Sequence, residues 1–124
     1  MLEALIIEPK EDTPKVVLDS INKVFQISER SLPENAIGFY EPVLEWLNQY
    51  ATDPVEITIF NFSLEYFNTA SAKQIAKILL ILENIAKKQR VAINWYYKKE
   101  DSDMLSSGTR FSKLIDLNFS FIES

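Results

Sequence analysis

The 124-residue sequence contains no cysteine and no histidine, and it contains only two glycines. Without cysteine the chain can form no disulfide, no thiolate nucleophile and no zinc–thiolate site. Without histidine it lacks the side chain that most often serves as a general base or as a metal ligand. The scarcity of glycine also leaves no Gly-rich loop that could cradle a phosphate group. These absences argue against the commonest kinds of catalytic centre.

Long hydrophobic runs and an excess of positive charge are also missing. No apolar run reaches the roughly 20 residues that a membrane-spanning helix needs. The start of the chain, M-L-E-A-L-I-I-E-P-K, is too acidic and its apolar part too short for a signal peptide. The formal net charge of −5 disfavours nucleic acid and anionic membranes as partners. We therefore expect a cytoplasmic protein that neither inserts into a membrane nor binds nucleic acid.

The residues that are present can build a hydrophobic core. Hydrophobic side chains make up 47% of the chain, and its length is that of one ordinary domain. No internal repeat and no long linker divides the sequence. We expect a single domain over residues 1–124.

Strand patterns alternate with helical patterns along the chain, which predicts an α/β domain with a mixed sheet and helices packed against it. The predicted strands are residues 2–7, 15–18, 23–28, 55–62, 90–97 and 117–122. The second and third of these form a hairpin around residues 19–22. Residues 55–62 are apolar at odd and even positions alike, so we expect a central strand covered on both faces.

The first predicted helix follows the segment S-L-P-E-N-A. Ser31 and Glu34 have the spacing of a capping box, with Pro33 in the first turn. Pro42 lies inside the helical pattern, so we expect a kink or a break near Tyr40. The apolar stripe of this helix comprises Ala36, Phe39, Tyr40, Val43, Leu47 and Tyr50.

Two further helices are predicted from apolar spacing. The second covers residues 72–88, and its lysines point toward water, so that Lys73 and Lys77 form a small solvated strip. Its buried stripe comprises Ala72, Ile75, Ala76, Leu79, Leu82 and Ile85. The third opens with residues 100–103 and places Met104, Gly108 and Phe111 on one face.

Two groups near the third helix could form sites, and each has a plainer explanation. Glu100, Asp101 and Asp103 could bind a divalent cation, but carboxylates at a helix start also favour the helix dipole, which is the preferred explanation. Tyr96 and Tyr97 could stack against a base or ring, but such a run more often packs within a sheet.

The segment L-E-Y-F-N-T-A-S-A-K joins a predicted strand to the second helix. It offers Asn68, Thr69 and Ser71, three residues that can cap a helix, within four positions. One cap needs only one of them. A helix start also stabilises a phosphate group, so a hydroxyl there can be phosphorylated without loss of the helix. From the residues alone, capping is the favoured explanation and phosphorylation is the alternative.

Several motifs in this order resemble the SiaC family, small bacterial regulatory phosphoproteins linked to biofilm control. The motifs are T-P near the N-terminus, S-L-P-E-N-A-I-G-F-Y-E-P-V, L-E-Y-F-N-T-A-S-A-K and N-W-Y-Y-K-K-E-D-S-D-M-L-S-S-G. The resemblance extends from Thr13 to Leu114. The family is similar in fold to STAS domains, the anti-sigma-factor antagonists. In those, the turn after a central strand reads roughly Asp-Ser-Ser-Gly and its first serine is phosphorylated.

The resemblance implies that Thr69 is the phosphoacceptor, with Ser71 as the second choice. It further implies a dedicated protein kinase and a metal-dependent phosphatase that write and remove the phosphate. The unmodified form of such a protein binds and stimulates a diguanylate cyclase, which raises cyclic di-GMP. The sequence departs from the family at Glu29 and Leu32, where Gly and Tyr are common, and at Ala70, where a second Ser is common.

We therefore expect a STAS-like regulator that has no catalytic activity and needs no cofactor. Its partner-binding residues are expected at the start of the second helix, at Asn68, Ser71 and Lys73. The alternatives are a STAS-like module that binds a small ligand or nucleotide, and an anti-sigma-factor antagonist in a partner-switching pathway. An enzyme is disfavoured because no paired catalytic groups are visible in the sequence.

Overall fold

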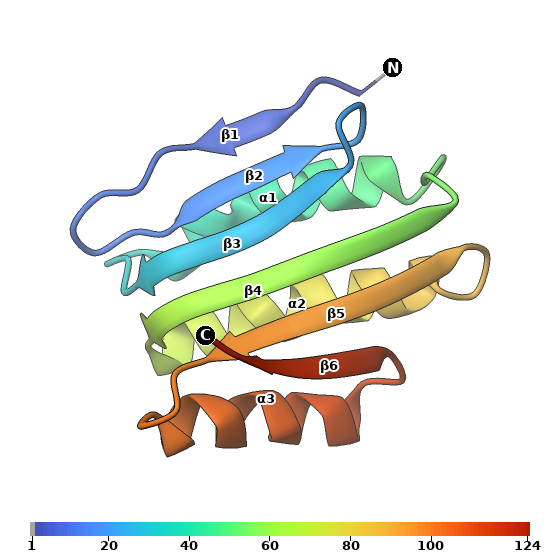
Figure 1. Ribbon diagram of the computed structural model, residues 1–124. Helices are drawn as coiled ribbons and strands as arrows, with labels where there is room; N and C mark the ends of the chain where they lie inside the picture. Colours follow the sequence, from blue (N-terminus) through green and yellow to red (C-terminus); the bar gives the residue numbers. More distant parts are fainter. Residues whose placement is uncertain (1) are drawn as a thin grey trace.

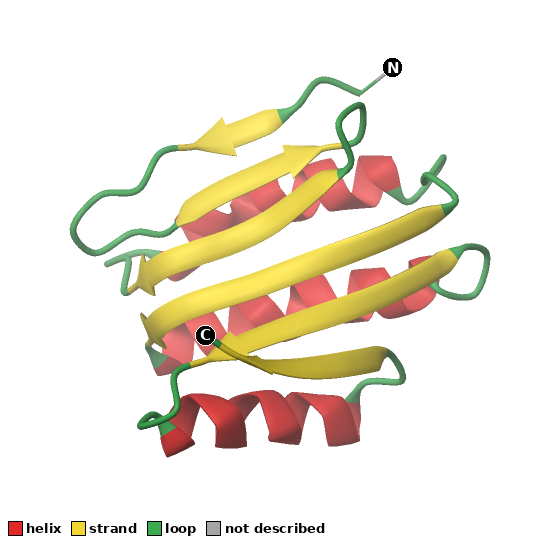
Figure 2. Ribbon diagram, viewed as in Figure 1, coloured by secondary structure: helices red, strands yellow, loops and turns green. Residues whose placement is uncertain are grey.

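Three consecutive strands, followed by helices that alternate with strands, make up residues 2–124, the part of the chain that the computed structural model describes (Figures 1 and 2). The strands are β1 (Leu5–Ile7), β2 (Lys15–Asp19), β3 (Val24–Ser31), β4 (Ile57–Phe67), β5 (Arg90–Tyr97) and β6 (Asn118–Glu123). The helices are α1 (Ala36–Tyr50), α2 (Thr69–Ile85) and α3 (Ser102–Leu114). Within this described part, no helix is both long and apolar enough to cross a membrane.

The strands form one mixed sheet in the order β1-β2-β3-β4-β5-β6. The first three strands are antiparallel neighbours, whereas β3, β4, β5 and β6 run parallel to one another. The β2–β3 hairpin turns where predicted, and the Asp19 carboxylate accepts hydrogen bonds from the N–H groups of Ile21 and Asn22, each at 3.0 Å. The predicted α/β class and mixed sheet are confirmed.

The helices cover one face of the sheet, so the prediction that β4 is covered on both faces is wrong. Each parallel crossover moves one strand further in the same direction along the sheet, as Figure 1 shows. Right-handed crossovers that all advance in one direction place their helices on the same side. Ile57 and Ile59 point to the other face and are 46% and 47% exposed.

The core lies between the covered face and the helices. Phe60 and Phe62 of β4 pack beside Trp95 of β5, with ring centroids 4.8 Å and 5.3 Å apart along this row. The predicted stripe of α1 is buried except for the partly exposed Phe39, and it also includes Trp46. In α2, Ala72 and Ala76 are only half-buried, and the buried residues beyond the prediction are Ser71, Gln74 and Ile78.

Pro42 does not break α1. The helix runs continuously from Ala36 to Tyr50 with Pro42 inside it. Of the two predicted alternatives, a kink or a break, the break is therefore excluded. Proline cannot donate to the carbonyl four residues earlier, which belongs to Gly38. Both residues are exposed, so water can satisfy that carbonyl.

Glu29 of β3 has a left-handed backbone, with φ of 75°, beside a β-bulge at which Glu65 of β4 has no partner in β3. This conformation costs an L-residue about 1 kcal/mol, whereas glycine adopts it freely. Replacing Glu29 with glycine should therefore raise the free energy of unfolding by about 1 kcal/mol. The neighbouring Arg30→Gly substitution, at a residue without positive φ, should lower it. Urea unfolding measures the free energy of unfolding of both variants. If both substitutions lower it equally, the backbone at Glu29 is not strained.

Candidate functional site

The turn between β4 and α2 carries the phosphorylation candidates. Asn68 is the N-cap of α2, and its side-chain oxygen accepts a hydrogen bond from the Ser71 N–H at 2.9 Å. This confirms that one of the three polar residues caps the helix. Thr69 is the first residue of α2 and is exposed. Its hydroxyl is therefore accessible to another protein.

Ser71 points the opposite way, into a buried chain of hydroxyl groups. The Ser31 hydroxyl donates to Ser71 Oγ at 2.8 Å, and the Ser71 hydroxyl donates to the Ser31 carbonyl at 3.0 Å. Because the single proton of Ser31 is used in this way, the Tyr40 hydroxyl must be the donor in its 2.6 Å bond to Ser31 Oγ. All three residues are 0% exposed. The network ties the start of α2 to the end of β3 and to α1.

Burial also affects the acidity of this network. Desolvation raises the pKa of Tyr40 to about 12, and the hydrogen bond with Ser31 only partly opposes this effect. Tyr40 therefore stays protonated at physiological pH and can donate its hydrogen bond to Ser31 Oγ.

The predicted capping box at Ser31 and Glu34 is wrong. Asn35 is the N-cap of α1, and its side chain accepts from the Gly38 N–H at 3.1 Å. Ser31 belongs to the end of β3, where its hydroxyl is already used by Tyr40 and Ser71. The exposed Glu34 lies outside the helix. Ser31 and Glu34 have the spacing of a capping box, but the Ser31 hydroxyl bonds instead to buried side chains later in the sequence.

The structure also contradicts two expectations for Ser71. A side chain that is 0% exposed offers no surface to a partner, and its hydroxyl cannot be reached by a kinase in this conformation. Thr69 is the exposed hydroxyl of the turn, while Asn68 is half-buried and Lys73 is exposed. The partner-binding roles of Asn68 and Lys73 stay predictions.

The acidic and aromatic groups near α3 have structural roles. Asp101 is the N-cap of α3 and accepts from the Met104 N–H at 2.9 Å, and Asp103 lies in the first turn. Residues 2–124 contain no group of three or more acidic side chains placed to hold a metal ion. Tyr96 and Tyr97 belong to β5, and both are partly buried. Tyr97 packs against the core, in line with the favoured explanation of strand packing, whereas Tyr96 alternates onto the other face of the sheet.

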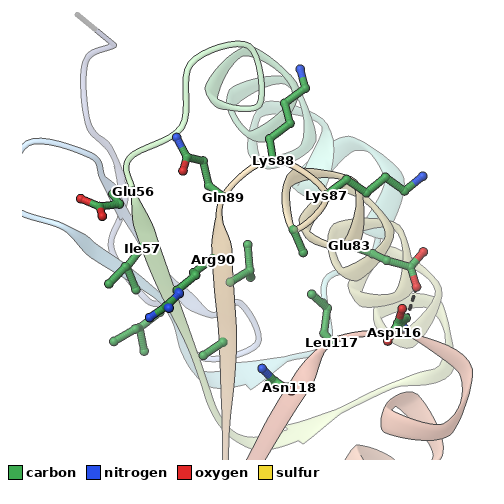
Figure 3. Close-up of a pocket in the computed structure, with 14 residues that line it drawn as sticks. Glu56, Ile57, Glu83, Lys87, Lys88, Gln89, Arg90, Asp116, Leu117 and Asn118 are labelled. Atoms are coloured by element: carbon green, nitrogen blue, oxygen red, sulfur yellow. Dashed lines mark hydrogen bonds between the residues drawn. The ribbon is translucent and has the colours of Figure 1, made fainter.

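An open hollow of about 1180 Å³ lies at the other end of the sheet (Figure 3). It is bounded by the end of α2 and the starts of β4, β5 and β6, with both basic and acidic side chains around it. The Asp116 N–H donates to the Glu83 carboxylate there at 2.6 Å. The length of α2, roughly 25 Å for its 17 residues, separates this hollow from Thr69. The hollow is therefore separate from the candidate phosphorylation site at Thr69.

Comparisons with known proteins agree with the resemblance seen in the motifs. A family model described as SiaC family regulatory phosphoprotein matches residues 7–124. An uncharacterized protein of Pseudomonas aeruginosa strain UCBPP-PA14 is 27% identical over 92 residues, which cover 73% of this chain and 71% of that protein.

Two crystal structures from Pseudomonas aeruginosa share the fold. Apo-SiaC matches with a TM-score of 0.88 at 22% identity, over 96% of this chain and 98% of that chain. A complex of the diguanylate cyclase SiaD with its activator SiaC contains a chain that matches with a TM-score of 0.88 at 22% identity. The match covers 97% of this chain and 99% of that one.

Proposed function

Because the chain belongs to the SiaC family of regulatory phosphoproteins, we propose that it is a cytoplasmic regulator controlled by phosphorylation of Thr69. In its unmodified form it binds and stimulates a diguanylate cyclase. A protein kinase ends this interaction by phosphorylating Thr69, and a protein phosphatase restores it. The SiaC chain that activates SiaD in Pseudomonas aeruginosa supports the choice of partner.

The observation that carries the proposal is the position of Thr69. Its side chain is exposed at the first residue of α2, whereas the other hydroxyl of the turn is enclosed. A phosphate group adds about −1.5 to −2 charges, and the start of a helix favours negative charge by about 0.3–1 kcal/mol. The fold can therefore accept the phosphate, and its effect falls on whatever docks over the turn.

Three variants at Thr69 test the proposal. Thr69→Ala should bind the cyclase like the wild type but should no longer respond to the kinase, because it removes the acceptor without adding charge. Thr69→Asp should bind more weakly, since a charge must then be desolvated in the complex. Pull-down with the diguanylate cyclase of the source bacterium, and mass spectrometry after incubation with the kinase, give the measurements.

Ser102 supplies the matched control, because it is the exposed first residue of α3. Ser102→Ala and Ser102→Asp should leave both binding and phosphorylation unchanged. Phosphate found on a residue other than Thr69, or undiminished binding by the phosphorylated protein, would contradict the proposal.

A further inference from the structure

The phosphoacceptor candidate stands at the head of a stripe along the outer side of α2. The stripe consists of Thr69, Lys73, Lys77 and Leu80, spaced by four, four and three residues, and all four side chains are exposed. We call this set the α2 stripe. Residues four and three apart share one side of a helix, so these side chains form a continuous row. Leu80 is 53% exposed and gives the row an apolar end.

The charge of the α2 stripe is opposite to that of the whole protein. The chain carries a net charge of −5, yet α2 contains two lysines and a single acidic residue, Glu83, which lies beyond Leu80 and accepts a hydrogen bond from the Asp116 N–H. The net negative charge of the protein repels an acidic partner segment, whereas the two lysines of this row attract it. The row is straight because it follows one helix, which suits a second helix lying along it.

We propose that the α2 stripe is the docking surface for an acidic amphipathic helix of the partner. Carboxylates of that helix pair with Lys73 and Lys77, and its apolar residues cover Leu80. This inference rests on the proposed function, in which the partner is a diguanylate cyclase whose binding depends on Thr69. It adds the chemistry of the partner segment and the residues that receive it.

The same geometry explains how phosphorylation of Thr69 blocks docking of the partner helix. Lys73 lies four residues after Thr69, and a negative group four residues before a lysine is the favourable order for a pair on a helix. A phosphate on Thr69 therefore pairs with Lys73 and cancels the positive charge of the stripe. The carboxylates of the partner then meet a dianion in place of an available ammonium group.

Binding of the purified diguanylate cyclase of the source bacterium, measured by calorimetry, tests the docking surface. Lys77→Glu and Leu80→Ala should each weaken binding about tenfold or more. Lys113→Glu makes the same charge change at an exposed lysine of α3 and should change the affinity by less than about twofold. Higher salt should weaken the wild-type complex and should affect a Lys73→Gln/Lys77→Gln double variant much less.

The outcomes separate this inference from the proposed function. If Lys77→Glu and Leu80→Ala bind like the wild type while phosphorylation still abolishes binding, the α2 stripe is wrong and the proposed function stands. If unmodified and phosphorylated wild type bind alike, or the cyclase does not bind at all, the proposed function fails.

The pairing of phosphate with Lys73 can be measured without the partner. Phosphothreonine can be placed at position 69 during translation, and its second ionisation can be followed by ³¹P NMR. Lys73→Gln should raise the phosphate pKa because it removes the neighbouring cation, whereas Lys77→Gln, eight residues from Thr69, should change it much less. Phosphorylation should also weaken cyclase binding by a smaller factor in Lys73→Gln than in the wild type. Equal phosphate pKa values in the wild type and Lys73→Gln would overturn the pairing.

Discussion

Replacing Gly108 with alanine should lower the free energy of unfolding by about 1–3 kcal/mol, although glycine-to-alanine changes inside helices normally raise it by about 1 kcal/mol. Gly108 is buried in α3, and a methyl group there would lie 2.5 Å from two atoms of the Trp95 ring, Cδ1 and Nε1. Such a distance is far inside van der Waals contact. Either α3 or the indole ring must therefore move.

Trp95 has little freedom to move. It is 0% exposed, and its indole N–H donates to the Met104 carbonyl of α3 at 3.0 Å. The rings of Phe62 and Phe111 lie against it, with centroids 5.3 Å and 5.7 Å away. Shifting the indole ring would strain this packing and weaken the hydrogen bond. The cost of overpacking should thus exceed the gain in helix propensity.

Ser106→Ala is the control for this prediction, because Ser106 is exposed in the same helix. It should leave the stability unchanged or raise it slightly, since alanine has the higher helix propensity. Urea unfolding followed by tryptophan fluorescence measures both variants. A Gly108→Ala protein as stable as the wild type would show that the contact between Gly108 and Trp95 is not close-packed.

Local patterns predicted the elements around this contact well. The strand at residues 90–97 was predicted with the bounds that β5 has, because a run of large apolar residues between polar ends has no good alternative. Met104, Gly108 and Phe111 were predicted to share one face of the third helix, and in α3 all three are turned toward the core, although Phe111 is only half-buried. What the spacing could not predict is that the indole ring of Trp95 lies over Gly108.

The errors about Ser31 and about the coverage of β4 share one cause: local spacing does not show which distant parts of the chain the fold brings together. Ser31 matched a capping box by spacing, but its hydroxyl bonds to Ser71, 40 residues later, in a pairing that only the parallel β3–β4 register brings together. The exposed Ile59 lies inside the apolar run of residues 55–62, which is typical of a strand buried on both faces. Whether helices cover both faces depends on the side to which the crossovers turn. Thr69 and Ser71 are likewise indistinguishable by spacing, because both lie in the first turn of α2.

Aspartate at position 71 should lower the free energy of unfolding by about 3 kcal/mol or more, whereas aspartate at position 69 should leave it unchanged or raise it by about 0.3–1 kcal/mol. Both positions lie in the first turn of α2, so the helix dipole favours negative charge at each. They differ in burial. Ser71 is 0% exposed, and its oxygen accepts from Ser31 while its hydroxyl donates to the Ser31 carbonyl.

A carboxylate at position 71 would lose the donated bond and would place a charge against the Ser31 carbonyl oxygen. The Ser31 hydroxyl could still donate to it, but no cation is present in the hydroxyl network of Ser31, Tyr40 and Ser71 to offset the desolvation. The carboxylate would therefore either break the network that joins α1 to α2 or take up a proton with a raised pKa. In the second case the variant should regain stability as the pH falls toward 5, and Thr69→Asp should show no such gain.

Thermal unfolding of the two variants between pH 5 and pH 8 provides the measurement, and Ser71→Ala separates the loss of the hydroxyl from the addition of charge. Ser71→Ala should cost only about 1–2 kcal/mol, because it removes the acceptor of the Ser31 hydroxyl proton and one of the two donors to the Ser31 carbonyl but buries no charge. The Ser31 carbonyl keeps its bond from the Asn68 N–H at 3.1 Å. If Ser71→Asp is as stable as Thr69→Asp, the Ser71 side chain can leave its buried site at little cost. A kinase could then reach it, and the choice of Thr69 as the phosphoacceptor would lose its structural basis. If only Ser71→Asp is unstable, phosphorylation of α2 without damage to the fold is restricted to Thr69.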